Sequence, residues 1–303
     1  MKKYKKVYIE ITNICNLKCT FCPGHKRVLK EMSANDFRTV IDKTHHIGEN
    51  FYLHLMGEPT AHSRFEEILD ICNSYGIRPN ITTNGTLLGK TGDIILKKDV
   101  RNVSISLHSF EANDLSNSLQ SYLAGITGFC QKALGSKTVV ELRLWNMSRE
   151  SLADKDSFNY QICEFLRENL ELGHDIYDKI NDTFFAMETN RKKNFRLKEN
   201  IFLGMSEQFS WPDIEKSPNE VCKGFCYGLR NQIAVLSDGT VVPCCLDANG
   251  NMPLGNIFED TIENIVTTPR AKSIYDGFTN HKAVEPLCQS CGYMKKYLQF
   301  KKI

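Results

Sequence analysis

The chain has 303 residues, 41% of them hydrophobic, which is enough for one large domain and a smaller one. Its 38 lysines and arginines nearly balance its 36 aspartates and glutamates, so it lacks the basic excess typical of nucleic-acid-binding proteins. No apolar run approaches the roughly 20 residues of a membrane-spanning helix, and the apolar run 7–11 contains Glu10, which argues against a secretion signal. We therefore expect a cytoplasmic protein with neither a nucleic-acid nor a membrane partner.

Apolar runs typical of strands alternate with amphipathic segments typical of helices over most of the first 170 residues. Such alternation predicts a parallel sheet with right-handed crossovers. Residues 174–218 are polar and weakly periodic, so we expect a last strand followed by a linker or a segment that covers the substrate. The predicted strands are residues 6–12, 51–55, 78–83, 100–107 and 137–144, and the predicted helices are residues 33–46, 65–75, 119–134 and 154–170.

Three cysteines lie close together directly after the first predicted strand. Cys15, Cys19 and Cys22 have the spacing C-x3-C-x2-C, and Phe21 directly precedes the last of them. Three thiolates at this spacing can hold three irons of a 4Fe–4S cluster, which leaves the fourth iron open to a small molecule. A structural zinc site is the alternative, because His25 could supply a fourth ligand.

This motif and its position resemble those of the radical S-adenosylmethionine (SAM) superfamily. The resemblance implies a partial (β/α)6 TIM-like barrel in which a 4Fe–4S cluster and SAM yield a 5′-deoxyadenosyl radical that abstracts hydrogen from a substrate. It also implies that residues 55–59, LMGEP, contact SAM. Gly57 would allow a close approach, and Glu58 would accept hydrogen bonds from the SAM ammonium. Gly-Glu-Pro is also an ordinary turn sequence.

Polar residues near the ends of the other predicted strands are expected to face the same cavity. The resemblance implies SAM contacts by Phe21, Asn84 and Ser106. On the fifth predicted strand Glu141 and Arg143 share a face, so they form an ion pair or Arg143 binds the SAM carboxylate or an anionic part of the substrate. His54 or His108 is expected to donate a proton. The predicted substrate contacts are Glu10, His54, His108, Glu141, Arg143 and Trp145.

Six of the 12 cysteines follow residue 220, whereas Cys72, Cys130 and Cys163 stand in apolar contexts typical of buried thiols. The dipeptide 238–239, Asp-Gly, lies between two apolar runs and predicts a β-hairpin. The region resembles the SPASM/twitch module of radical SAM enzymes, which implies an auxiliary 4Fe–4S cluster, with zinc as the alternative. The implied ligands are Cys226, Cys244, Cys288 and Cys291, and either Cys222 or Cys245 could replace a neighbour.

We therefore expect a radical SAM domain over residues 1–215 and a small, cysteine-rich hairpin and helix domain over residues 216–303. Because the first cysteine is residue 15, an N-terminal peptide-binding domain does not fit before it, and we expect a small substrate. The compact layout resembles that of queuine lyases, which release 7-aminomethyl-7-deazaguanine. The alternatives are a dehydrogenase of a small alcohol, a maturase of ribosomal peptides and, in a different class, a non-catalytic metal-binding protein. An electron donor such as flavodoxin or ferredoxin is the expected protein partner.

Overall fold

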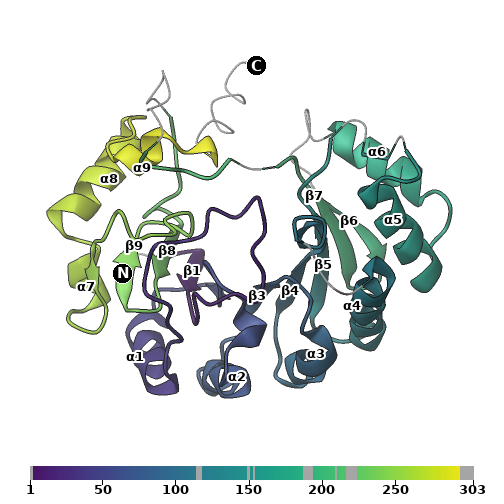
Figure 1. Ribbon diagram of the computed structural model, residues 1–303. Helices are drawn as coiled ribbons and strands as arrows, with labels where there is room; N and C mark the ends of the chain where they lie inside the picture. Colours follow the sequence, from purple (N-terminus) through teal and green to yellow (C-terminus); the bar gives the residue numbers. More distant parts are fainter. Residues whose placement is uncertain are drawn as a thin grey trace. The chain divides into compact units, whose positions relative to one another are not determined.

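A computed structural model of the protein describes residues 3–113, 118–148, 151–152, 154–186, 194–208, 210–215 and 224–293. The chain forms two compact units, which are described separately. Unit 1 comprises Met1–Asn16, Cys22–Pro79 and Phe209–Ile303, and unit 2 comprises Leu17–Phe21 and Asn80–Gln208. Each unit combines strands with helices (Figure 1), which confirms the predicted α/β class. No described helix is both long enough and apolar enough to span a bilayer.

Unit 1 contains a mixed set of strands in which β1 lies between β2 and β8. Strand β1 pairs in parallel with β2 and β8, β9 pairs antiparallel with β8, and β10 pairs antiparallel with β9. The predicted hairpin at residues 238–239 is present between β8 and β9, so it joins the C-terminal cysteine region to the edge of β1. The bounds are Lys6–Ile9 for β1, Phe51–Tyr52 for β2, Gln232–Val235 for β8, Thr240–Val242 for β9 and Gly255–Asn256 for β10.

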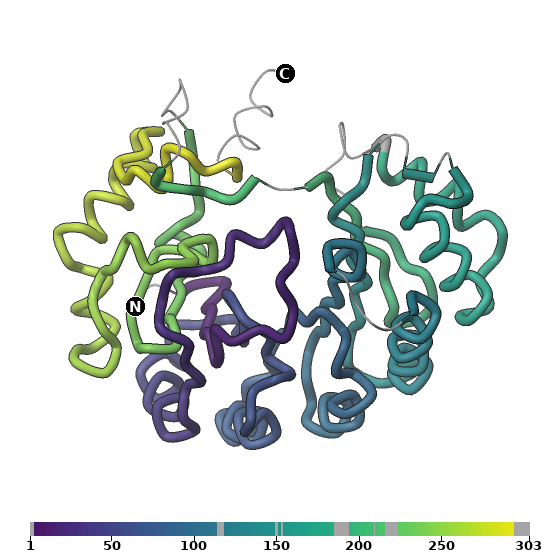
Figure 2. The backbone as a smooth tube through the Cα atoms, viewed as in Figure 1, coloured from purple at the N-terminus to yellow at the C-terminus, as the bar shows by residue number. Residues whose placement is uncertain are grey.

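Helix α1 of unit 1 begins after a serine that caps its first turn. Ser33 precedes α1, and its side chain accepts a hydrogen bond from Asp36 N at 3.1 Å, as expected for an N-cap. The long segment between β1 and α1, purple in Figure 2, carries the N-terminal cysteines and forms no regular helix or strand. The bounds are Ala34–Thr44 for α1, Pro59–Ala61 for the 3₁₀ turn η1, Phe65–Ser74 for α2, Ile262–Ile265 for α7, Pro269–Thr279 for α8 and Pro286–Gln289 for α9.

In unit 2, β3, β4, β5 and β7 are parallel neighbours in that order, and β6 pairs antiparallel with β7. Along β5, Val140, Leu142 and Leu144 are buried, whereas Glu141 and Arg143 are half-buried, which is the alternation predicted from the sequence. The strand bounds are Asn80–Thr83, Asn102–Ser106, Val139–Leu144, Asn194–Lys198 and Ile201–Met205 for β3 to β7. The helix bounds are Leu88–Lys97, Leu119–Ala133, Phe158–Asn169 and Ile176–Ala186 for α3 to α6.

Three parts of the chain differ from the sequence prediction. Helix α3 was not predicted, and α6, β6 and β7 occupy most of the described part of residues 174–208, where we expected one strand and a linker. Strand β4 ends at Ser106, and the 3₁₀ turn η2 (Leu107–Ser109) follows it. His108 therefore lies in this turn, one residue beyond the predicted strand 100–107, and does not continue the strand after Ser106.

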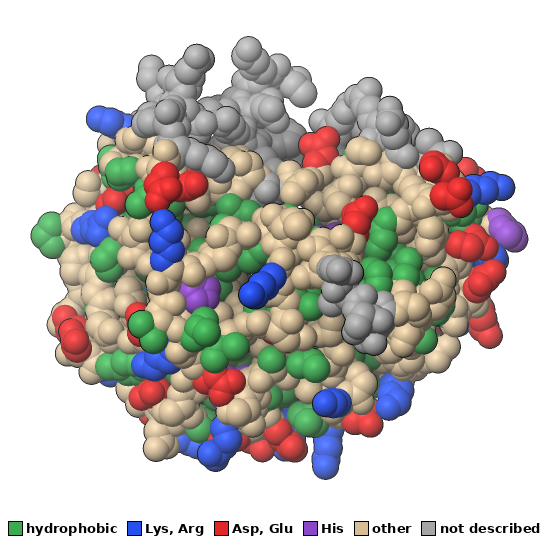
Figure 3. Space-filling model, viewed as in Figure 1, with side chains coloured by type: hydrophobic (Ala, Val, Ile, Leu, Met, Phe, Trp, Pro, Cys, Tyr) green, Lys and Arg blue, Asp and Glu red, His purple; other side chains and the backbone are tan. Residues whose placement is uncertain are grey.

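On the face shown in Figure 3, basic and acidic side chains are interspersed, in keeping with the net charge of only +2. Cys72, Cys130 and Cys163 are buried in the helices α2, α4 and α5, as predicted for structural thiols. Burial raises the pKa of each of these thiols well above its usual value.

Candidate functional site

The segment 10–33, which follows β1 and carries Cys15, Cys19 and Cys22, is called the cysteine loop. Within unit 1, hydrogen bonds from its own polar side chains hold it in place. Asn13 donates from Nδ2 to Val28 O at 2.8 Å, and its Oδ1 accepts from Lys30 N at 2.7 Å. His25 Nε2 lies 2.9 Å from Asn13 O. His25, which could have completed a zinc site, thus uses one ring nitrogen to hold the loop backbone.

A buried ion pair joins the cysteine loop to the end of β1. Glu10 is fully buried at the end of β1, and Arg27 binds it through two bonds, Nη1 to Oε2 at 2.8 Å and Nη2 to Oε1 at 2.6 Å. The backbone nitrogens of Met56 and Ser237 donate to the two carboxylate oxygens as well. Internal groups therefore contact both oxygens and hold Glu10 in place, and its predicted contact with substrate stays a prediction.

The 55–59 segment forms a tight turn against the residues that precede Cys15. Gly57 has φ +76°, and a Cβ atom there would lie 2.3 Å from Thr12 O. Glu58 N donates to Ile14 O at 2.9 Å, and Glu58 Oε1 accepts from Thr60 Oγ1 at 2.6 Å. Glu58 therefore caps η1 in the manner of an ordinary turn, and its predicted bond to the SAM ammonium stays a prediction.

His54 lies in an aromatic group of unit 1. Its ring stands edge-on to Tyr8 and Tyr52, with centroid distances of 5.7 and 5.9 Å, and these two tyrosines stack on each other at 4.8 Å. Burial raises the pKa of Tyr8 far above its usual range. The setting explains how His54 is held, and its role toward substrate or as a proton donor stays a prediction.

A row of polar side chains crosses three neighbouring strands of unit 2. Ser104 Oγ and Arg143 Nε both donate to Glu141 Oε2, each at 2.8 Å, and Arg143 Nη1 lies 3.4 Å from Thr82 Oγ1. The Arg143 and Glu141 side chains are 18% and 22% exposed. The ion pair predicted for β5 is thus present, and it remains accessible to solvent.

Next to this row, aromatic rings stack around His108. The Phe21 and His108 centroids are 4.8 Å apart, the His108 and Trp145 rings are nearly parallel with centroids 6.2 Å apart, and Arg143 Cζ lies 4.7 Å from the Trp145 ring centre. Burial, together with the charge of Arg143, lowers the pKa of His108 to about 4. His108 is therefore neutral near pH 7, and it could donate a proton there only if a bound substrate raised this pKa.

The two remaining predicted SAM contacts lie at the ends of β3 and β4. Asn84 Oδ1 accepts from Thr86 N at 3.0 Å, and its backbone oxygen accepts from Tyr122 OH at 2.7 Å, so Asn84 shapes the turn after β3. Ser106 is the last residue of β4 and pairs in register with Arg143. Their contacts with SAM stay predictions.

The thiols of the C-terminal region lie near one another in unit 1. Burial and the neighbouring Cys291 and Cys245 together raise the pKa of Cys226 to about 11. Burial and neighbouring thiols, Cys226 among them, raise the pKa of Cys244 and of Cys288 well above the usual value. Thiols that influence one another in this way suit a shared metal or an iron–sulfur cluster. Cys245 also packs beside Tyr8. Cys222 lies outside the described residues.

The described side chains of the two cysteine groups do not lie at the distances of a metal-bound site. Among the described Cys, His, Asp and Glu side chains, no three stand together at metal-ligand geometry. The proposed ligand sets therefore depend on thiol chemistry and spacing.

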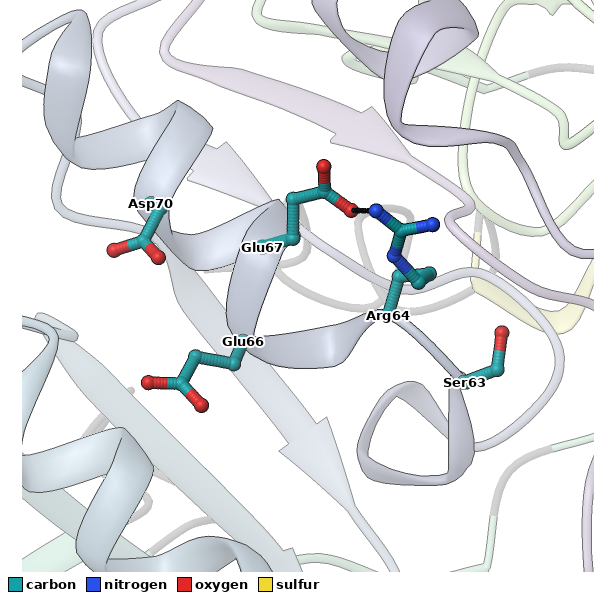
Figure 4. A pocket seen from close by; sticks show the side chains of 5 residues that line it. All are labelled: Ser63, Arg64, Glu66, Glu67 and Asp70. Atoms are coloured by element: carbon teal, nitrogen blue, oxygen red, sulfur yellow. Dashed lines mark ion pairs between the residues drawn. The ribbon is translucent and has the colours of Figure 1, made fainter.

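A pocket of about 320 Å³ lies at the start of α2 (Figure 4) and is lined by Ser63, Arg64, Glu66, Glu67 and Asp70. Arg64 and Glu67 pair across it at 2.5 Å, and it contains none of the predicted site residues.

Sequence reasoning missed two residues that hold the cysteine loop. Arg27 looked like one more basic residue after the motif, and its buried partner lies 17 positions away in the sequence. Asn113 binds the loop from 94 positions away, donating from Nδ2 to Cys19 Sγ at 3.1 Å. No local sequence signal marks either contact, because both depend on how distant segments meet.

Two family models match this chain, one over the region of each cysteine group. Residues 9–133 match the family model of the radical SAM superfamily, and residues 226–292 match that of the SPASM iron–sulfur cluster-binding domain. A tungsten-containing aldehyde ferredoxin oxidoreductase cofactor-modifying protein from Pyrococcus furiosus is 24% identical over 95% of this chain and 87% of its own length.

Two solved structures share the fold. The structure of BtrN in complex with AdoMet and 2-DOIA has a TM-score of 0.57 at 17% identity, covering 96% of this chain and 94% of BtrN. The structure of Streptococcus suis SuiB bound to precursor peptide SuiA has a TM-score of 0.60 at 19% identity, covering 97% of this chain and 71% of SuiB. At these identities the likeness establishes the α/β fold alone.

Proposed function

Because this chain is a radical SAM enzyme with a C-terminal SPASM domain, we propose that it cleaves SAM reductively and transforms a small polar substrate bound by unit 2. When bound, the 4Fe–4S cluster and SAM supply a 5′-deoxyadenosyl radical that takes hydrogen from the substrate. Cys15, Cys19 and Cys22 would hold that cluster, and the C-terminal cysteines would hold a second one. A one-electron donor such as flavodoxin or ferredoxin would supply the electron.

The half-buried pair of Glu141 and Arg143 carries the proposal. Ser104 and Arg143 both donate to Glu141 Oε2, so Oε1 is placed to accept a hydrogen bond from a substrate hydroxyl or amino group. Oε1 lies toward Gly204 on β7, where a Cβ atom would come within 2.8 Å of it. The guanidinium of Arg143 would donate to a substrate oxygen. The pair therefore favours a substrate that bears both donors and acceptors.

The aromatic side chains beside the pair favour a ring in that substrate. Trp145 is 40% exposed, and its ring lies against Arg143 and parallel to His108. A flat, partly exposed indole is a good surface for a planar or cyclic ligand. Because His108 is neutral near pH 7, we propose that it orients the substrate by hydrogen bonding and donates a proton only when the substrate raises its pKa.

The reaction that follows hydrogen abstraction has three candidates. Expulsion of an amine would make the enzyme a lyase, for which queuine is the specific substrate predicted above. Transfer of a second electron from the substrate radical to the proposed C-terminal cluster, with loss of a proton, would make it an alcohol dehydrogenase. Modification of a ribosomal peptide is the third. The fold holds 2-DOIA in BtrN and a precursor peptide in SuiB, so likeness in fold alone favours neither class. None of the relatives described above is named for queuine, so queuine enters as one arm of the substrate test.

The test is anaerobic turnover with SAM and a chemical reductant. We expect 5′-deoxyadenosine formation to rise when a small cyclic amine or alcohol is added, and deuterium to move from the labelled substrate into 5′-deoxyadenosine. Queuine, cyclic amino alcohols and peptides form the substrate panel. Deuterium transfer from a peptide but from no small molecule would overturn the small-substrate proposal.

A pair of matched variants tests whether Glu141 of unit 2 contacts the substrate. Glu141→Gln keeps the size of the side chain and removes its charge, so we expect a rise of about tenfold or more in the substrate KM, since a bond to a charged group contributes about 1.5–3 kcal/mol. SAM cleavage without substrate should persist. The control is Glu168→Gln, an exposed carboxylate on α5 that pairs weakly with Arg167. Equal KM values for the two variants would exclude Glu141 from the substrate site.

A further inference from the structure

Asn113 makes an unusual set of contacts with the cysteine loop. Its Oδ1 accepts from Lys18 N at 2.9 Å, and its Nδ2 donates to Ser109 O at 2.6 Å and to Cys19 Sγ at 3.1 Å. A neighbouring backbone bond, Thr20 N to Ala112 O at 3.2 Å, continues the contact. The Asn113 amide thus binds both the residue before Cys19 and the Cys19 sulfur, and the backbone of Ala112 binds the residue after it.

The orientation of this amide follows from its partners. Lys18 N is a donor, so it must face the amide oxygen, and Ser109 O is an acceptor, so it must face the amide nitrogen. A flipped amide would set donor against donor and acceptor against acceptor. The second N–H of Asn113 is therefore directed toward Cys19 Sγ by contacts that do not involve the sulfur.

We propose that Asn113 is a positioning residue that holds Cys19 in place and, by donating a hydrogen bond to its sulfur, raises the reduction potential of the SAM-binding cluster. A thiolate bound to iron accepts hydrogen bonds better than a neutral thiol does. The reduced cluster carries one more negative charge than the oxidised one, so an N–H directed at its sulfur stabilises the reduced form more. Hydrogen bonds to sulfur are among the recognised determinants of cluster potentials.

The test compares reduction potentials in the full-length, anaerobically reconstituted protein. The EPR signal that changes on addition of SAM identifies the N-terminal cluster among the iron–sulfur signals. In Asn113→Leu we expect the midpoint potential of that cluster to fall by about 59 mV, which is a tenfold change in a one-electron equilibrium. Asn169→Leu is the matched control, because this asparagine of α5 donates to a helix carbonyl, Phe165 O, within its own helix. A potential unchanged from wild type in Asn113→Leu with full iron content would overturn the proposal.

If Asn113→Leu fails to retain its cluster, a second variant and a measurement on the wild-type protein still test the proposal. Asn113→Asp retains an oxygen that can accept from Lys18 N but has no N–H for Cys19, so we expect a cluster of normal iron content and lower potential. Pulsed EPR of wild-type protein labelled with ¹⁵N-asparagine should show a weak nitrogen coupling to the reduced cluster. An unchanged potential in Asn113→Asp, or no such coupling in the wild type, would refute the hydrogen bond. Neither result depends on the identity of the substrate.

Discussion

The imidazole of His108 is held neutral by its surroundings, and this has a consequence for stability. Its pKa in the folded protein is about 4, whereas an exposed histidine has a pKa of about 6.5. Between these values the unfolded chain takes up a proton and the folded chain does not. The contribution of His108 to the free energy of unfolding is therefore complete above about pH 6.5 and falls as the pH drops toward 4.

We predict that this loss amounts to about 3 kcal/mol at pH 4. His108→Phe keeps a ring between Phe21 and Trp145 and removes the titrating group, so its unfolding free energy should fall less between pH 6.5 and 4. Urea unfolding of the two metal-free proteins at a series of pH values measures the difference. Parallel pH profiles would show that His108 is not held neutral by burial.

Gly57 illustrates a second constraint at the scale of one residue. Gly57→Ala should destabilise the protein by more than the roughly 1–2 kcal/mol of a left-handed backbone, because its Cβ would lie 2.3 Å from Thr12 O. Gly76→Ala is the matched control, since Gly76 has a similar φ of +68° with no atom within 4 Å of its Cβ position. Denaturant unfolding compares the two. Equal losses would mean that the turn yields and that the close contact is unimportant.

Among the elements, the cysteine loop depends on the pair of Glu10 and Arg27. Arg27→Met leaves a buried carboxylate without its cation, so we predict a loss of about 3–5 kcal/mol in unfolding free energy. Adding Glu10→Gln in the same protein should recover part of that loss. The control is Arg64→Met, whose pair with Glu67 is largely exposed and should contribute less than about 1 kcal/mol. A small effect of Arg27→Met would mean that water reaches Glu10.

The elements also show where sequence reasoning succeeds and fails. Period-2 alternation correctly placed Glu141 and Arg143 on one face of β5, because one face of that strand is buried and the other is not. The ion pair, one of the two arrangements expected for them, is present. Helix α3 was missed because Gly89 and Gly92 disfavour a helix in isolation. In the fold, Gly92 lies where a Cβ atom would be 2.9 Å from Phe129 Cδ2 on α4, so close packing of the two helices requires it. Contacts such as that of Asn113 with Cys19 have no local pattern to read.

For the whole molecule, two metal centres are expected to load independently, because their ligands come from opposite ends of the sequence. The N-terminal set is Cys15, Cys19 and Cys22, within the radical SAM match, and the C-terminal thiols lie within the SPASM match. Each 4Fe–4S cluster contains four irons, so anaerobic reconstitution should give about eight irons per chain. About four irons with one zinc would replace the second cluster by a structural zinc.

The variant that separates the two centres replaces Cys15, Cys19 and Cys22 together by alanine. Two of these side chains are exposed and the third is half-buried, so their truncation removes little packing and the chain should fold. We predict that about four irons remain, because the C-terminal thiols stay near one another in unit 1. Reductant-dependent formation of 5′-deoxyadenosine should be abolished, because the ligands of the SAM-binding cluster are gone. Iron analysis and chromatography of the reaction products measure both quantities. If 5′-deoxyadenosine still formed at the wild-type rate, SAM cleavage could not depend on the N-terminal cysteines, and complete loss of iron would show that the centres load cooperatively.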